Sequence, residues 1–170
     1  KLLPVLNIPD LYHLFAGMTI PLAEWGTFGF FVNFVSFGET VVSNDEADNS
    51  SGGANSSEIV GGFSYGTHLT KSTGLGLNVK FFYSDLSSGA SSDGSEATTF
   101  SYAFDVGILT KDLFVKDLDA ALVVANIGPS VYYTDKSEQD PIPFTWRLGL
   151  SYELLNSIDH RLILAADYNR

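Results

Sequence analysis

The stretch that decides the fold is EIVGGFSYGTHLTKSTGLGLNVKFFYS, residues 58–84. On both sides of a turn at Lys71, bulky side chains such as Phe63 and Leu77 alternate with small or polar ones such as Gly62 and Asn78. A side-chain period of two belongs to a β-strand and not to a helix. We therefore predict a hairpin. Each arm has about the ten residues with which a tilted strand crosses a bilayer.

The same alternation returns along the rest of the chain, after an entry segment over residues 1–13. It predicts further strands over residues 14–22, 27–38, 99–109, 118–126, 144–153 and 162–169. The alanine content of residues 118–126 leaves the facing of that strand open. With the hairpin, this makes about eight consecutive strands. The predicted fold class is all-β, an antiparallel transmembrane up-and-down β-barrel or part of one.

The connections between these strands alternate in length. Short turns near Ala23, Lys71 and Leu154, and a somewhat longer connection over residues 110–117, alternate with long polar loops over residues 39–57, 87–96 and 127–141. Outer-membrane barrels are built in this way, with short turns on the periplasmic rim and long loops outside the cell. A soluble β-sandwich has no physical reason to sort its loops by length.

Composition narrows the class further. The 170 residues fit one domain, and 45% hydrophobic with 17% charged residues excludes a disordered chain. No apolar run reaches the roughly 18 residues that a membrane helix needs. The net charge of −11 argues against nucleic acid as a partner, and the absence of cysteine excludes a disulfide framework and thiolate chemistry.

The two faces of the predicted strands differ in a way that favours a barrel. The small face is rich in glycine and poor in charge, while almost all acidic residues fall in loops. A barrel lumen accepts small polar residues, and lipid accepts the bulky face. In a soluble β-sandwich, the alternative, the bulky face would form the core. Aromatic residues near strand ends are candidates for interfacial girdles: Trp25, Tyr83, Phe144, Tyr152 and Tyr168.

Five charged residues fall within or near strands on the predicted inner face: Lys80, Asp105, Arg147, Arg161 and Asp167. A charge at bilayer depth faces the interior and finds a partner. Hairpin pairing brings Asp105 near Lys80 and Asp167 near Arg147, so we predict luminal ion pairs. The alternative is that each charge projects separately into luminal water.

Five blocks of sequence resemble successive blocks of the PorV/PorQ family: residues 12–17, 32–39, 126–128, 143–152 and 165–170. Their order and spacing agree along nearly the whole chain. The resemblance implies a FadL-like outer-membrane barrel of about fourteen strands. Because about eight strands are predicted here, residues 1–170 are expected to be a single barrel domain that is a fragment of a larger one. One departure from the family pattern is Asn33, which stands where a basic residue is expected.

The resemblance also implies a function. Members of this family belong to the type IX secretion system of Gram-negative bacteria and are not enzymes. PorV-like members receive cargo with a C-terminal signal domain from the translocon barrel and pass it to the cell-surface attachment complex. The implied partners are therefore the translocon barrel, cargo signal domains and outer-membrane lipid, with no cofactor. An alternative from another class is a FadL-like channel for hydrophobic small molecules, which needs an apolar internal pocket.

Partner contacts are expected on the long loops. The candidate residues are Asn44, Asp45, Glu46, Asp48, Asp93, Glu96, Tyr132, Tyr133 and Asp135. His13, His68 and His160 are scattered and lack a second ligand at metal spacing, so no metal site is predicted. No nucleophile elbow or phosphate-binding loop is present either.

Overall fold

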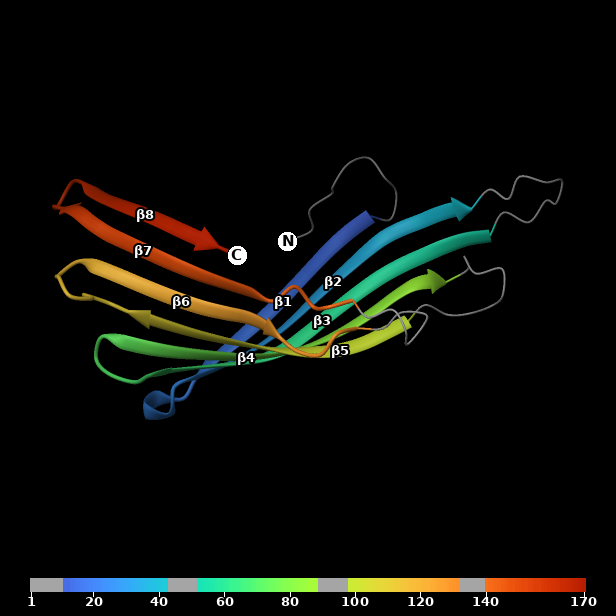
Figure 1. Cartoon of the computed structure of the whole chain (residues 1–170), viewed down its shortest axis with the longest axis horizontal. Coiled ribbons are helices and arrows are strands. Elements are labelled where there is room, and N and C mark those ends of the chain that lie inside the picture. The colour runs from blue at the N-terminus through green and yellow to red at the C-terminus, as the bar shows by residue number, and fades with distance from the viewer. Residues whose placement is uncertain (1–10, 43–51, 89–97, 132–139) are drawn as a thin grey trace.

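The computed structural model describes residues 11–42, 52–88, 98–131 and 140–170. Its eight strands are β1 (Leu11–Pro21), β2 (Thr27–Val42), β3 (Gly52–His68), β4 (Thr73–Ser88), β5 (Thr98–Thr110), β6 (Leu118–Ile127), β7 (Thr145–Asn156) and β8 (Arg161–Asn169). A short 3-10 helix, η1 (Ala23–Trp25), joins β1 to β2. Every strand pairs antiparallel with the next one along the chain, in a single sheet (Figure 1). The predicted all-β up-and-down fold is confirmed, and the sheet is not closed, because β1 and β8 lie at its two edges.

Several strands are longer than their sequence pattern predicts. β1 begins at Leu11, inside the predicted entry segment, and β2 and β3 continue to Val42 and from Gly52, inside the predicted loop. The added residues are paired, since Glu39 lies opposite Asn55 and Val42 opposite Gly52 beyond a bulge. Backbone hydrogen bonds hold a ladder together whatever its side chains. Polar composition therefore ends the apolar band without ending the strand.

The alternation of short and long connections is confirmed. Residues 22–26, 69–72, 111–117 and 157–160 connect strands at one end of the sheet, which we call the short-turn rim. Residues 43–51, 89–97 and 128–144 connect strands at the opposite end. Figure 1 shows the long strands β2, β3 and β4 running toward this second end.

The register divides the side chains into two faces, because residues opposite one another in an antiparallel pair point to the same side. The bulky face carries, among others, Phe30 on β2, Phe63 on β3 and Val79 on β4, which lie side by side across three strands. The polar face carries the residues between them, such as Ser64 and Asn78. The same division continues to β8, where Tyr168 lies opposite Leu148 on the bulky face. Register also resolves the facing of β6, since Leu122 lies opposite Ile108 on the bulky face.

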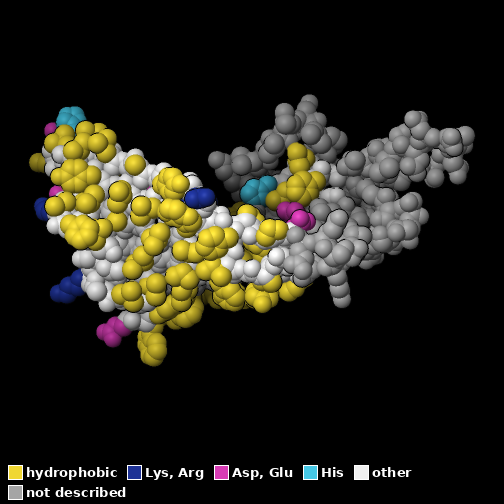
Figure 2. Space-filling view, viewed as in Figure 1, with side chains coloured by type: hydrophobic (Ala, Val, Ile, Leu, Met, Phe, Trp, Pro, Cys, Tyr) yellow, Lys and Arg dark blue, Asp and Glu magenta, His cyan; other side chains and the backbone are white. Residues whose placement is uncertain are grey.

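No described residue packs over the side chains of the bulky face. Many of its large side chains are more than a third exposed, for example Val106 at 38% and Phe100 at 66%, and Figure 2 shows hydrophobic side chains over much of the visible surface. The described part of the chain has no large side chain that is fully buried. Its buried polar residues, Ser84, Thr99 and Ser101, lie on the polar face instead. A β-sandwich buries its bulky face against a second sheet. The described residues form one sheet, so the sandwich alternative is wrong for them.

Among the described residues, no helix is long and apolar enough to cross a membrane.

Candidate functional site

A cluster of polar side chains occupies the middle of the polar face. Its members come from four consecutive strands, and we call them the polar cluster: Ser64 on β3, Asn78 and Lys80 on β4, Asp105 on β5 and Asn126 on β6. The alternation places the side chains of Ser64, Asn78, Lys80 and Asp105 on the polar face, and Asn126 joins them through the bulge between β5 and β6 and its positive φ. Side chains of the cluster thus connect the four strands from β3 to β6, in addition to the backbone hydrogen bonds between them.

Asp105 is the centre of the polar cluster. Lys80 Nζ lies 2.7 Å from Asp105 Oδ1, so the predicted ion pair between these two residues is formed. Asn78 Nδ2 donates to Asp105 Oδ2 at 2.9 Å, and the backbone N–H of Asn126 donates to Asp105 Oδ1 at 2.8 Å. Ser64 Oγ extends the network by donating to Asn78 Oδ1 at 3.0 Å. Both side chains of the ion pair are largely buried, at 15% and 18% exposed.

Asn126 fastens the connection that follows β6 to the polar cluster. Its Oδ1 accepts a hydrogen bond from Lys80 Nζ at 2.6 Å, and its Nδ2 donates to the carbonyl of Pro143 at 2.9 Å. The backbone of Asn126 has φ of +61°, a left-handed conformation that asparagine adopts more readily than most residues. One residue therefore turns the chain, accepts a hydrogen bond from the Lys80 ammonium and holds Pro143.

Replacing Asn126 by aspartate separates these roles. The variant keeps an oxygen for Lys80 but cannot donate to the Pro143 carbonyl. We expect faster amide hydrogen exchange over residues 140–144, with β3 to β5 protected as before, measured by mass spectrometry. Asn126→Ala, which removes both bonds, is the second variant. Unchanged exchange at residues 140–144 in both variants would show that Asn126 does not hold this segment.

Val131 and residues 140–143, from the described parts of the connection that follows β6, lie against the polar face. Val131 and Asp140 are joined by two backbone hydrogen bonds of 2.8 and 3.0 Å. Val131, residues 140–143 and the strands enclose a pocket of about 310 Å³. Apolar walls come from Val60, Phe82 and Ile142, and Glu58 lies among the polar lining residues. The pocket is therefore an apolar space with an acidic group at its margin.

The other predicted luminal charges are placed differently. Arg147 lies opposite Asn169 and Asp167 opposite Gly149, one diagonal step apart on the polar face. The ion pairs among the described residues are Lys80–Asp105 and Glu153–Arg161, so the expected pair of Arg147 with Asp167 is not formed. Arg161 begins β8 beside the short-turn rim, with its side chain 65% exposed, and its guanidinium lies 2.6 Å from Glu153.

The predicted partner-contact residues cannot be placed. They lie outside the residues that the structure describes: Asn44, Asp45, Glu46, Asp48, Asp93, Glu96, Tyr132, Tyr133 and Asp135. The five candidate girdle aromatics are described, and all of them are more than a third exposed, from 40% at Tyr152 to 79% at Trp25. Their role at a membrane interface stays a prediction. Asn33, the departure from the family pattern, is hydrogen-bonded to His13, which donates from Nε2.

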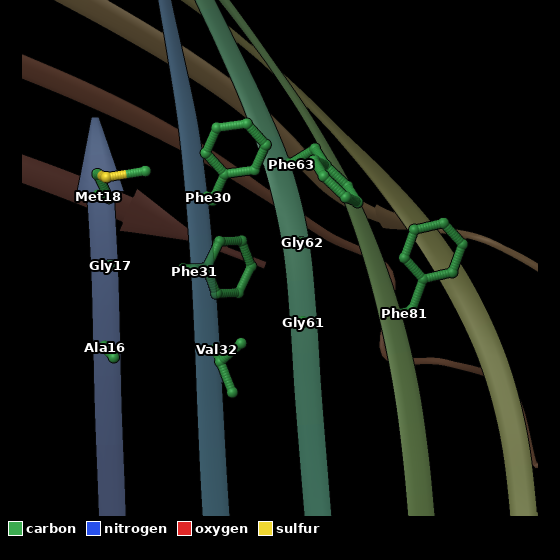
Figure 3. Close-up of a pocket in the computed structure, with 10 residues that line it drawn as sticks. All are labelled: Ala16, Gly17, Met18, Phe30, Phe31, Val32, Gly61, Gly62, Phe63 and Phe81. Carbon is green, nitrogen blue, oxygen red and sulfur yellow. The ribbon is translucent and has the colours of Figure 1, made fainter. Parts of the chain in front are cut away.

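A shallow pocket lies where small residues interrupt the aromatic surface of β1 to β4 (Figure 3). The rings of Phe30, Phe63 and Phe81 stand around it, and Gly61 contributes no side chain to fill it. A Cβ at Gly61 would meet only the carbonyl oxygen of Phe31, at 3.8 Å. At Gly62, which faces the other way, a Cβ would lie 2.5 Å from the Phe31 ring and 2.7 Å from the Val79 carbonyl oxygen.

These two adjacent glycines give a matched pair of variants. Gly62→Ala is expected to lower the free energy of unfolding by about 1–3 kcal/mol, because the methyl group overpacks the polar face. Gly61→Ala is expected to leave stability unchanged within about 0.5 kcal/mol, since its methyl group enters open space. Urea titration of both variants measures the difference. Equal losses would mean that Phe31 does not lie over Gly62.

Comparison with known proteins finds no family model that matches this chain and no curated protein that is similar to it. The resemblance to the PorV/PorQ family therefore stays a prediction from the sequence. Among the described residues, no group of three or more histidine, cysteine or acidic side chains is arranged to hold a metal ion. The chemistry of the described site is that of hydrogen bonds, one largely buried ion pair and apolar surface.

Sequence reasoning found Lys80 and Asp105 because both are charges on a strand. It missed Ser64, Asn78 and Asn126, whose side chains complete the polar cluster. The available signal for Asn126 was its place at the end of a predicted strand, where asparagine tolerates the left-handed backbone of a turn. Pro143 contributes only its carbonyl group, which leaves no trace in a residue pattern.

Proposed function

We propose that this chain forms part of the wall of a transmembrane β-barrel in a bacterial outer membrane, and that it serves type IX protein secretion as a non-enzymatic component. The observation that carries the membrane part is the bulky face, which is apolar and exposed from β1 to β8. Such a face is too large to remain in contact with water. Lipid covers it without requiring a second sheet.

The dimensions of the bulky face support a bilayer as its cover. On β4 the apolar positions run from Leu75 to Tyr83, and on β5 from Phe100 to Ile108. Both bands are about nine residues long, close to the 9–11 residues with which a tilted strand crosses a membrane. Beyond Tyr83, β4 continues through Asp85 as a more polar strand. The band is thus bounded on one side by the short-turn rim and on the other by polar strand extensions.

The polar cluster supports the same assignment from the other face. A largely buried ion pair that is hydrogen-bonded to Asn78 and Asn126 suits an interior that excludes bulk water. The unpaired edges of β1 and β8 cannot stand open in a membrane, because backbone groups there have no water to bond. We infer that further strands close the barrel between β8 and β1.

The secretion part of the proposal rests on the five blocks of sequence that resemble the PorV/PorQ family. It is tested by extracting the full-length protein from outer membranes with mild detergent and identifying co-purifying proteins by mass spectrometry. Recovery of a translocon barrel or of cargo with a C-terminal signal domain is the expected result. A variant that lacks residues 44–51, between β2 and β3, is expected to fold and to lose these partners. Recovery of the barrel without protein partners would overturn the secretion role.

A channel for hydrophobic small molecules is the second candidate. One observation favours it, namely the apolar pocket formed by Val60, Phe82 and Ile142 on the polar face. The same purification distinguishes the two functions. Stoichiometric lipid or another apolar molecule, lost on Phe82→Ala and not on Phe81→Ala, would establish the channel, because Phe82 lines this pocket and Phe81 lies on the opposite face.

A further inference from the structure

Each of the four connections on the short-turn rim presents a large apolar side chain to its surroundings. The exposed fractions are 79% for Trp25, 55% for Leu69, 94% for Phe114, 54% for Val115 and 103% for Ile158. Turns that protrude into water are normally made of small and polar residues. Four apolar tips on four consecutive turns of one rim need a physical reason.

Phe114 shows that the backbone is shaped to present its tip. The N–H of Val115 donates to the carbonyl of Leu113 at 2.8 Å, and Phe114 between them has φ of +63°. A three-residue turn with positive φ at its centre is rare and strained, and it is rarer still with an aromatic residue. Strained backbone persists where the surrounding structure over-determines it, and it is commonly found where function requires it.

The surrounding structure does hold this turn. Leu113 N–H donates to the carbonyl of Leu118 at 2.7 Å, and Asp117 N–H donates to Asp112 Oδ1 at 2.7 Å. Lys111 N–H donates to Ser72 O at 2.8 Å, which ties this turn to the neighbouring β3–β4 turn. These hydrogen bonds therefore hold the turn in place, and the ring of Phe114 is almost fully exposed.

Cations accompany the apolar tips. Lys71 lies two residues after Leu69, Lys111 and Lys116 flank Phe114, and Arg161 follows Ile158 by three residues. Three of the nine lysine and arginine residues of the chain thus lie on this rim, and Arg161 begins β8 beside it. The rim also carries four acidic residues, namely Glu24, Asp112, Asp117 and Asp159. The apolar band of the bulky face also reaches it, since Ile108 is two residues from the end of β5. The rim thus has exposed aromatic side chains next to lysines and adjoins an apolar surface. This composition is typical of protein at the boundary between phospholipid headgroups and acyl chains.

We propose that the short-turn rim is an interfacial anchor. Phe114 and Trp25 enter the headgroup layer of the adjacent phospholipid leaflet, while Lys111 and Lys116 bind lipid phosphates. The inference rests on the proposed membrane location and adds to it the depth at which the barrel sits. Anionic phosphate next to these lysines is the ligand chemistry, and the source is a phospholipid surface.

The test uses two forms of the full-length protein in vesicles of phosphatidylcholine and phosphatidylglycerol, each with one tryptophan within residues 1–170 and with any tryptophan outside these residues replaced by phenylalanine. The reference form carries Trp25→Phe and keeps Trp146, which lies on the bulky face opposite Val124. The tip form carries Trp25→Phe, Trp146→Phe and Phe114→Trp. Lipids brominated on their acyl chains close to the headgroup quench tryptophan at the interface, and acrylamide quenches tryptophan in water.

We expect blue-shifted emission and quenching by brominated lipid in both forms. Lys111→Gln with Lys116→Gln in the tip form is expected to reduce lipid quenching in anionic vesicles and not in neutral ones. Quenching of Trp146 by lipid with quenching of the tip only by acrylamide would overturn the anchor and leave the membrane location standing. A tip shielded from both quenchers would overturn it in favour of a protein contact. Absence of lipid quenching at Trp146 would overturn the membrane location itself.

Discussion

Replacing Asp105 by alanine is expected to lower the free energy of unfolding by about 3–5 kcal/mol. The substitution removes the ion-pair partner of Lys80 and two hydrogen bonds, which Asn78 Nδ2 and the Asn126 backbone N–H donate to Asp105. The largely buried Lys80 ammonium then keeps Asn126 Oδ1 as its one hydrogen-bond acceptor among the described residues. An uncompensated charge in a site of low polarity costs more than the net worth of the pair.

Urea unfolding of the vesicle-embedded protein, followed by tryptophan fluorescence, measures the loss. The control is Glu153→Ala, which breaks the ion pair with Arg161, leaves a guanidinium that is 65% exposed, and is expected to cost less than about 1 kcal/mol. Lys80→Met together with Asp105→Leu removes both charges, and this double variant is expected to be more stable than Asp105→Ala alone. A loss below about 1 kcal/mol for Asp105→Ala would show that water reaches the pair and that the polar cluster is not an excluded interior.

The alternation that predicted the fold involves residues close together in the sequence, and predictions of this kind are confirmed. Alternation over residues 58–84 and the order of the strands depend only on neighbours in sequence, and both are confirmed. Strand ends were predicted less well, because the ladder from Glu39 to Val42 is set by pairing with residues 52–55 and not by its own composition. A sequence pattern records where apolar surface stops, which here is before the hydrogen bonds stop.

Contacts between strands depend on register. The two predicted ion pairs have the same diagonal register, but only one of them is formed among the described residues. Lys80 and Asp105 are joined by a regular hairpin ladder, in which Asn78 lies opposite Asp105, so Lys80 is a diagonal neighbour of Asp105. Arg147 and Asp167 are also diagonal neighbours, yet they form no pair in the described structure. A diagonal position allows a salt bridge to form, and the hydrogen-bond acceptors around the two charges decide whether it does. Asn126 supplies such an acceptor for Lys80. A bulge between β5 and β6, which the alternation in the sequence does not reveal, brings Asn126 to the polar face.

Replacing Leu150 by arginine is expected to lower the free energy of unfolding in a bilayer by about 2–4 kcal/mol. Leu150 lies near the middle of β7 on the bulky face, opposite Ala120 and Ala166. Its side chain is 45% exposed with no described residue covering it, so the structure alone sets no steric obstacle to a longer side chain. The cost comes from the surroundings, because a guanidinium at the depth of the acyl chains loses its hydration.

Ser151→Arg is the matched control, since the adjacent residue points to the polar face and lies opposite Asp119. It is expected to change stability by less than about 0.5 kcal/mol, because luminal positions tolerate charge and an acid is within reach. Urea unfolding in vesicles compares the two variants under the same conditions. If both arginines cost the same small amount, the bulky face does not meet lipid and the membrane location is wrong. If Leu150→Arg alone is costly, the face that the structure leaves uncovered is the face that the bilayer covers.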